Sequence, residues 1–444
     1  MAPKEQTVLK QLFLYVGPAV LGLLVNALYN IVDRIFVGQF VGADGLSAVT
    51  MVFPITLLKF GFVLLFGSGA GVLIAKYLGE SDPEKAEMVL GNMIAGLLVT
   101  IVLFTAAGLL FYEPLLELMG ARGQLLDMSA EYLLVIILGF PLSFFIALEF
   151  TCRAEGNPRL PAILTLVSAL INVSLDLVFM KGFDMGVRGA ALATIIAQGV
   201  NALLLLWYYA SGKSRIALSW KNIKLQKKVL FPIMLLGTAP FIMDCATSLQ
   251  NMIANNLLLQ AGGPPAVAVM GIIFGVNVFF MMTALGIGDG IQPLISFNLG
   301  AKDHDRNRKT LRYTLIIVGS VGLLGVLFLE LLPNLITGIF INNDESIENM
   351  AQVALRIFAL SIPFYMVQII ATRYVQALHE KKIAIFFALL RPILLYVPIA
   401  YGLNAMFGLN GVWSSFAVSD SLAALISFLI IKKTLYPTPN TGRI

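Results

Sequence analysis

Charged residues are scarce in this chain. Of its 444 residues only 12% are Asp, Glu, Lys or Arg, whereas 58% are hydrophobic. A soluble domain carries about 25% charged residues, so this chain has too little charge to cover the surface of a water-soluble protein of its size. The composition argues against an ordinary soluble enzyme and favours a protein surrounded by lipid.

Cysteine and histidine are also nearly absent. Cys152 and Cys245 lie in or beside apolar blocks, and His304 and His379 lie in predicted loops. Two cysteines do not make a disulfide framework, and their spacing does not fit a metal site. The chain also has no Walker-type loop of glycines and lysine for nucleotide phosphates. We therefore expect a protein without metal or cofactor, and one that does not pump with ATP.

The hydrophobic residues fall in blocks long enough to cross a bilayer, which takes about 20 residues of helix. The first block is long and has no small-residue cleavage site after it, so we expect membrane insertion and not a cleaved signal. We predict an all-α polytopic membrane protein with spans near residues 11–37, 46–75, 89–112, 129–151, 160–181, 187–210, 229–259, 266–297, 311–332, 350–376, 383–405 and 410–431.

The basic residues predict the orientation of these spans. If the amino terminus is cytoplasmic, the loops after even-numbered spans and both termini hold most lysines and arginines. The opposite loops hold only Arg122, Lys181 and Arg188. This asymmetry is the positive-inside pattern, so we expect both termini in the cytoplasm. The net charge of +5 then reflects topology, and we do not expect a nucleic-acid partner.

The two halves of the chain are similar to each other. Leu78-Gly79 follows the second predicted span, and Leu299-Gly300 follows the eighth. These and other matching segments are separated by a nearly constant shift of about 220 residues. A basic linker, residues 211–228, separates an amino-terminal lobe, residues 1–210, from a carboxy-terminal lobe, residues 229–444. Parallel repeats of six helices with a site at their interface are typical of transporters.

Polar side chains line one face of several spans in the first half. A carboxylate near the bilayer centre costs about 2.5–3.5 kcal/mol, so such residues are expected to be functional. Their spacing places each set on one helix face. The sets are Asn26, Asn30 and Asp33, then Ser168, Asn172 and Asp176, then Thr194, Gln198 and Asn201. The alternative is that Asp33 and Asp176 lie near helix ends among lipid headgroups.

The repeat provides an internal control for the two aspartates. At the repeat shift, Ile253 is the partner of Asp33 and Ile399 is the partner of Asp176. A structural requirement would be common to both repeats. A carboxyl pair in one repeat alone therefore indicates function, such as binding and releasing a cation.

The second half has embedded polar residues of its own. Either they line a substrate path or they form ordinary interhelical hydrogen bonds. They include Asp244, Ser248, Asn251, Asp289 and Gln368, together with Asp420, to which the sequence assigns no role. Pro18 lies inside the first span, where it permits a bend that is either a static kink or a moving hinge.

A remote alternative is an intramembrane aspartyl protease. Residues 286–289 read G-I-G-D, which matches half of that signature. These enzymes need two aspartates that share a proton. Asp244 follows Met243 where the enzymes have tyrosine, so the other half of the signature is missing.

Four stretches resemble the multidrug and toxic compound extrusion (MATE) family, in the right order and on the right helices. They are residues 26–38 (NALYNIVDRIFVG), 48–54 (AVTMVFP), 172–179 (NVSLDLVF) and 286–300 (GIGDGIQPLISFNLG). The resemblance covers nearly the whole chain. It implies a V-shaped fold of two lobes and export of cationic or amphipathic small molecules against H⁺ or Na⁺, by a monomer in a prokaryotic inner membrane.

The resemblance to the family branch with acids on helices one and five also implies roles for residues. Asp33 and Asp176 would carry the coupling ion, Asn172 and Thr194 would complete the polar site, and Pro18 would be the bending point. The branch with an aspartate on helix ten is not matched. A flippase for lipid-linked sugars, from the wider superfamily, is the alternative function, but it would need basic groups in its cavity.

Overall fold

The computed structural model describes residues 7–119, 121–340 and 345–435, and within these ranges the chain is helical with short connections and no strand. Among the described residues, ten helices are long and apolar enough to cross a membrane, and the bent pair Glu348–Ala359 and Ile362–Ala377 makes an eleventh if it is one span. The longest of these candidates, Lys381–Lys433, is broken at Gly408. The predicted all-α polytopic fold is confirmed.

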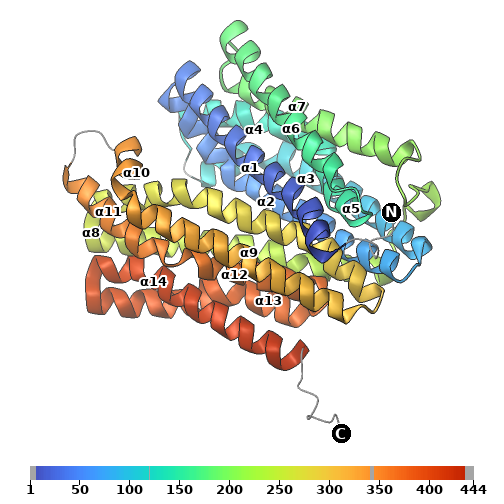
Figure 1. Ribbon diagram of the computed structural model, residues 1–444. Coiled ribbons are helices and arrows are strands. Elements are labelled where there is room, and N and C mark those ends of the chain that lie inside the picture. Colours follow the sequence, from blue (N-terminus) through green and yellow to red (C-terminus); the bar gives the residue numbers. More distant parts are fainter. Residues whose placement is uncertain (1–6, 120, 341–344, 436–444) are drawn as a thin grey trace. The chain divides into compact units, whose positions relative to one another are not determined.

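The first six spans use seven α-helices (Figure 1). The helix between Gln124 and Ala154 passes through a short 3₁₀ turn, and the next span ends in a π-helical turn. In chain order the elements are α1 (Val8–Phe40), α2 (Ala43–Gly79), α3 (Pro83–Leu118), α4 (Gln124–Ser143), η2 (Phe144–Ala147), α5 (Leu148–Ala154), α6 (Arg159–Asp176), η3 (Leu177–Gly182) and α7 (Gly186–Ala210).

The remaining spans follow the short turn η4 (Trp220–Asn222). Two long helices change direction at a glycine with positive φ, namely α8 at Gly263 and α14 at Gly408. The elements are α8 (Lys227–Gly300), α9 (His304–Leu331), α10 (Pro333–Phe340), α11 (Glu345–Ala359), α12 (Ile362–Ala377), α13 (Lys381–Leu389), η5 (Leu390–Leu395) and α14 (Tyr396–Leu435).

The similar segments of the two halves fold alike. Asp82 caps α3 by accepting a hydrogen bond from the Lys85 N–H at 3.1 Å. Asp303 caps α9 in the same way, accepting from the Arg306 N–H at 3.0 Å. An aspartate at this position satisfies a helix N–H that has no partner within the helix. The matching aspartates in the two halves therefore start equivalent helices.

The described residues form two compact units. Unit 1 contains the described residues up to Val20, then Ala239–Ile295, then those from Asp303 onward. Unit 2 contains Leu21–Thr238 and Ser296–Lys302. Helix α1 thus contributes to both units. Its described residues up to Val20 belong to unit 1 and those from Leu21 onward belong to unit 2, so the boundary lies two residues after Pro18. The lobe boundaries at residues 210 and 229 remain a prediction, because this division by contacts is a different one.

Unit 2 is built around α4, which packs against α2, α3 and α7, while α6 packs on α7. Its core holds an edge-to-face set of aromatic rings. The ring centroid of Phe104 on α3 lies 6.4 Å from Phe140 and 5.7 Å from Phe144. This apolar packing joins α3 to α4 and to the 3₁₀ turn η2.

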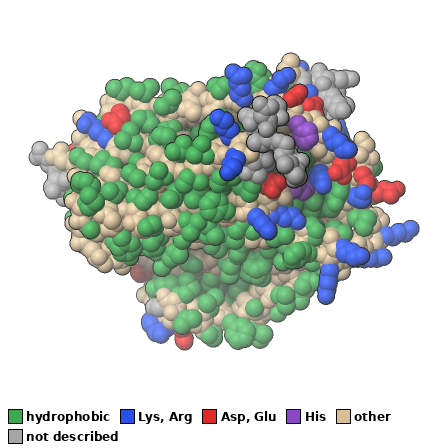
Figure 2. Space-filling model, turned by 90° about the horizontal axis from the view of Figure 1, so that it is seen from below, with side chains coloured by type: hydrophobic (Ala, Val, Ile, Leu, Met, Phe, Trp, Pro, Cys, Tyr) green, Lys and Arg blue, Asp and Glu red, His purple; other side chains and the backbone are tan. Residues whose placement is uncertain are grey.

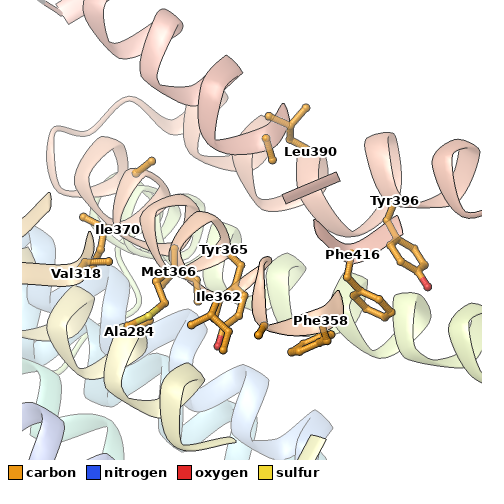
Figure 3. Close-up of a cluster of buried hydrophobic side chains, with 14 of the residues drawn as sticks. Ala284, Val318, Phe358, Ile362, Tyr365, Met366, Ile370, Leu390, Tyr396 and Phe416 are labelled. Atoms are coloured by element: carbon orange, nitrogen blue, oxygen red, sulfur yellow. The ribbon is translucent and has the colours of Figure 1, made fainter. Parts of the chain in front are cut away.

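Unit 1 is organised around α12, which packs against α9 and α14. Figure 3 shows buried side chains from these helices that meet in one cluster, among them Tyr365, Met366 and Phe416. The Phe416 ring lies 5.4 Å from Phe358 and 4.8 Å from Tyr396, measured between centroids. The side chains of α12 are almost all buried, so α12 is the central helix of this unit.

Large apolar side chains cover much of the outer surface. Leu110 on α3 and Leu324 on α9 are 71% and 65% exposed. Figure 2 shows hydrophobic side chains over most of the face in view, with charged side chains gathered mainly toward one end. Such a surface is suited to lipid and not to water, so the chain is a multi-pass membrane protein.

Candidate cation-coupling site

The four residues expected at the coupling site lie in unit 2 and meet there. Asp176 is the last residue of α6, at the point where the helix passes into the π turn η3. Asn172 lies one turn earlier on the same face, and its side-chain amide donates to the Thr194 hydroxyl of α7 at 3.5 Å. Turns of π-helix are frequent at functional sites, and this one directly follows an embedded acid.

Asp33 and Asp176 face each other. Asp33 is 8% exposed and Asp176 is fully buried. Their carboxyl groups are close enough to share a hydrogen bond when one of them carries a proton. Neither oxygen of Asp176 has another hydrogen-bond partner. In a low-dielectric setting, two facing carboxyls repel each other strongly when both are charged.

The other polar residues expected to line the site have separate partners. The Asn30 amide donates to the carbonyl and the side-chain oxygen of Asn26, at 2.7 and 2.8 Å, on an exposed face of α1. The Ser168 hydroxyl donates to the Ala197 carbonyl at 2.9 Å. Gln198 accepts from the Lys59 amine at 3.3 Å. These hydrogen bonds lead to partners other than the acid pair.

Two tyrosines near the acids were not predicted from the sequence. Tyr132 on α4 is buried and lies within electrostatic reach of both Asp33 and Asp176. Tyr29 on α1 lies within reach of Asp33, and its hydroxyl hydrogen-bonds with the side chain of Gln198. A tyrosine in an apolar helix carries no sequence signal of its own, since it packs equally well as a core residue.

Lys59 on α2 is a further unpredicted residue. Its side chain is buried in unit 2, and its amine donates to the Gln198 side chain. No carboxylate of the described residues lies within 4.0 Å of it as a salt-bridge partner. An amine buried in a membrane helix is costly and is by default a functional candidate. The sequence signal was present, as a single lysine amid an apolar block.

A second polar cluster forms around Glu149 at the start of α5. Its carboxylate accepts from the Arg153 guanidinium at 3.1 Å, the Asn201 amide at 3.0 Å and the Thr165 hydroxyl at 3.3 Å. These partners come from α5, α7 and α6 respectively. The Glu149 side chain is only 12% exposed. Glu149 is therefore the common acceptor of three elements.

In unit 1, the predicted Asp289 is neutralised by an arginine. Its carboxylate lies 3.2 Å from the Arg373 guanidinium of α12, and both side chains are buried. A Cβ on Gly288 would lie 2.8 Å from Cγ of Arg373, so the glycine makes room for the arginine stem. The contact gives both Gly288 and Asp289 of the G-I-G-D sequence a structural role.

The two outer glycines of this motif pack on the first helix. A Cβ on Gly286 would lie 2.6 Å from Cα of Val20, and one on Gly290 would lie 2.7 Å from Cα of Val16. Small residues spaced four apart let membrane helices approach closely. The motif thus joins the described start of α1 to α8 within unit 1.

The remaining candidates of unit 1 have diverse environments. Asp244 is half-buried on α8, within electrostatic reach of Arg373 and Asp289. The Ser248 hydroxyl donates to the Asp244 carbonyl at 3.0 Å, and Asn251 is half-buried. Gln368 is buried and does not line an open surface.

Two contacts tie helices of unit 1 together through buried polar groups. The Gln368 amide donates to the Phe387 carbonyl at 3.2 Å, and its oxygen accepts from the Ser427 hydroxyl at 2.6 Å. Asp420 accepts from the Arg391 guanidinium at 2.7 Å. These are interhelical hydrogen bonds of the ordinary kind, the alternative that the sequence left open for this half.

Comparison with known proteins identifies the family. Residues 18–178 and residues 240–402 each match the MatE family. The chain belongs to the MatE family of transporters. The double match also places one copy of the family's repeat in each half of this MatE protein, as the internal similarity indicates.

Two relatives match this MatE protein over nearly the whole length of both chains. It is 28% identical over 429 residues to the multidrug export protein MepA of Staphylococcus aureus strain MRSA252, covering 96% of this chain and 94% of MepA. The same values hold for MepA of Staphylococcus saprophyticus subsp. saprophyticus.

Solved structures of MatE proteins have the same fold. A MOP superfamily transporter from Pyrococcus furiosus Vc1 superposes with a TM-score of 0.89 at 22% identity, over 96% of this chain and 95% of that one. A mutant of the MATE transporter VcmN of Vibrio cholerae gives a TM-score of 0.88 at 24% identity, over 97% and 98% of the two chains. The architecture is therefore that of a MATE transporter.

Proposed function

We propose that this MatE protein is a secondary active multidrug exporter that exchanges cationic or amphipathic small molecules for H⁺ or Na⁺ by alternating access. The relatives named MepA are multidrug export proteins, and they match 96% of the chain. The chain acts as a multi-pass protein of a prokaryotic inner membrane, with both termini in the cytoplasm, and as a monomer.

The coupling site is the facing pair Asp33 and Asp176, completed by Asn172 and Thr194. The observation that carries this assignment is the burial of two facing carboxyls, one of them without any other hydrogen-bond partner. When the pair is loaded with a cation its charge is reduced, and the surrounding helices can close on it. When it is empty, the repulsion between two carboxylates favours their separation. Cation loading thereby biases one of two arrangements.

Helix α1 transmits this change. It carries Asp33 in unit 2, whereas its described start, up to Val20, belongs to unit 1. Pro18 cannot donate a backbone hydrogen bond within the helix and so weakens it there. We assign Pro18 as the hinge at which α1 bends when the acid pair is loaded or emptied.

Efflux of a cationic dye, ethidium, from cells or proteoliposomes tests this function. Asp33→Asn and Asp176→Asn each remove one carboxyl while keeping side-chain size, and each should reduce uphill efflux by about 100-fold or more. Asp127→Asn changes an exposed acid in the first turn of α4 and should leave efflux unchanged. Wild-type efflux in both site variants would refute the coupling assignment, and no efflux by the wild type would refute the export function.

Imposing a pH gradient or a Na⁺ gradient separately across the same vesicles identifies the coupling ion. The facing acids suit a proton because a shared hydrogen bond between carboxyls requires one. Dye uptake that follows the pH gradient at constant Na⁺ is the expected result.

A further inference from the structure

A row of polar side chains runs between α6 and α7 from Asp176 toward Glu149 of α5, with separate hydrogen bonds at intervals along it. We call it the inner seam and define it by Asp176, Asn172, Ser168 and Thr165 of α6 with Thr194, Gln198 and Asn201 of α7. On α6 these residues are spaced by four, four and three positions, which keeps them on one face. At about 1.5 Å per residue the eleven positions span about 16 Å along the helix.

The two helices are joined at three levels of the inner seam. Asn172 donates to Thr194 at 3.5 Å, and Ser168 donates to the Ala197 carbonyl at 2.9 Å. At the end farthest from Asp176, Thr165 and Asn201 both donate to Glu149, at 3.3 and 3.0 Å. One carboxyl group thus lies at each end, with hydroxyls and amides between them.

A third helix borders the inner seam along its middle. Tyr29 of α1 hydrogen-bonds with Gln198 and lies within electrostatic reach of both Asp33 and Glu149. Its hydroxyl is therefore placed between the two carboxyl clusters. Lys59 of α2 contacts the same Gln198 from another side.

We propose that the inner seam conducts the coupling proton between the Asp33–Asp176 pair and Glu149, and that Glu149 is the group that releases it at the far end of the seam. The inference rests on the proposed function, in which Asp33 and Asp176 bind the coupling ion, and it adds the path and the release group. If the amino terminus is cytoplasmic, α4 runs inward toward Glu149, so the release end faces the cytoplasm.

The chemistry of the inner seam favours a proton over a metal cation. Hydroxyl and amide groups can hold water molecules in a line, and a proton passes along that line by exchange of O–H bonds. Each step moves one proton from an O–H group to an acceptor oxygen, and the last acceptor is the Glu149 carboxylate.

The charges that face Glu149 suit a release group. Arg153 contacts its carboxylate directly at 3.1 Å and is itself only 10% exposed. The guanidinium holds the Glu149 carboxylate in place at this end of the seam. Arg34 lies within electrostatic reach of Asp33 at the other end. Both ends of the seam therefore combine carboxyl groups with an arginine.

The test uses the full-length protein in Na⁺-free proteoliposomes with a pH-sensitive dye enclosed and ethidium as substrate. Glu149→Gln keeps an oxygen that accepts from Thr165 and Asn201 but cannot take up a proton. We expect ethidium affinity within about twofold of the wild type, while substrate-coupled proton flux falls by about 100-fold. Glu149→Asp should restore part of this flux.

Two controls keep the result interpretable. Glu149→Gln also breaks the ion pair with Arg153, so the double variant with Arg153→Gln removes both charges of that pair and should show the same loss of flux. Glu84→Gln changes an exposed glutamate of α3 and should behave as the wild type. Thermal unfolding of each purified variant verifies that it is folded.

The outcomes separate this inference from the proposed function. Wild-type proton flux in Glu149→Gln, with flux abolished in Asp33→Asn, would overturn the inner seam and leave the coupling site intact. A loss of flux matched by an equal loss of ethidium affinity would make Glu149 a substrate contact and would also overturn it. Wild-type flux in Asp33→Asn would instead overturn the proposed coupling site itself.

Discussion

Gly79 and Gly300 occupy equivalent positions in the two repeats and pack against each other's helix in the same way. A Cβ on Gly79 would lie 2.0 Å from the carbonyl oxygen of Phe297, and a Cβ on Gly300 would lie 2.0 Å from that of Lys76. Phe297 and Lys76 each precede their own glycine by three residues, so the contact is reciprocal. The match between Leu78-Gly79 and Leu299-Gly300 therefore reflects a close crossing that only glycine permits on both sides.

Gly79→Ala and Gly300→Ala should each destabilise the protein. The added methyl group has to displace a backbone carbonyl and not a flexible side chain, so the helices must move apart. Overpacking of this kind costs about 1–3 kcal/mol. Thermal unfolding in detergent should show a lower midpoint for both variants. Gly319→Ala on α9, where a Cβ meets nothing within 4 Å, should leave the midpoint unchanged or raise it. Equal midpoints for all three variants would contradict the close crossing.

Breaking the buried Asp289–Arg373 pair should be more costly than breaking an exposed pair. Asp289→Asn leaves Arg373 charged and buried without its partner, which costs about 3–5 kcal/mol. The combined change Asp289→Leu with Arg373→Met removes both charges and should recover most of that loss. Glu330→Gln breaks the exposed pair with Arg356, at 3.9 Å, and should cost under about 1 kcal/mol.

Chemical unfolding of the purified variants measures this ranking. If the double variant were as unstable as Asp289→Asn, the loss would come from packing around Gly288 and not from the unpaired charge. If Asp289→Asn were as stable as Glu330→Gln, the buried pair would contribute no more to the free energy of unfolding than the exposed pair.

Glu155 should make the attachment of the linker depend on pH. This buried residue between α5 and α6 accepts hydrogen bonds from the Ser214 hydroxyl and, at 3.0 Å, from the Arg215 N–H. Burial raises the pKa of the Glu155 carboxyl above its ordinary value. A released linker would expose the carboxyl and return its pKa to the ordinary range. The docked state therefore holds the proton more tightly, and docking weakens as pH rises through the raised pKa.

Limited proteolysis of residues 211–228 measures this attachment. Cleavage of the wild type should become faster as the pH is raised from the ordinary glutamate range through the raised pKa. Glu155→Gln keeps an acceptor oxygen and cannot ionise, so its cleavage rate should be flat over that range after correction for the protease. A pH dependence that persists in Glu155→Gln would assign the effect to another group.

The sequence predicted the helices and the acid pair because both depend on local patterns. Apolar block length decides where a span can be, and the spacing of Ser168, Asn172 and Asp176 already places them on one face. The pairing within a polar stripe was less predictable. Asn26 and Asn30 bond to each other, and their lining of a shared pocket with Asp33 stays a prediction.

Other features of the candidate site depend on which helices meet, and one sequence does not contain that information directly. Glu149 gains its partners from residues 16 and 52 positions away, and Lys59 finds Gln198 at a distance of 139 positions. Nothing in the local sequence distinguishes Glu149 from a glutamate at a helix end among headgroups. Its burial beneath α6 and α7 is a property of the tertiary packing alone.

Lys59 should decide whether Na⁺ can compete with the proton in the inner seam. Its buried amine donates to Gln198 in the middle of the seam, and a positive charge there disfavours the binding of Na⁺. Wild-type ethidium transport driven by a pH gradient should therefore be insensitive to added Na⁺. Lys59→Gln removes the charge while keeping a side chain that can bond to Gln198, and Na⁺ should then slow the transport by about tenfold or drive it.

Lys85→Gln, at an exposed position on α3, serves as the matched control and should stay insensitive. If Na⁺ affects the wild type and Lys59→Gln alike, the ammonium is not a barrier to Na⁺ and its burial serves packing with α7 alone.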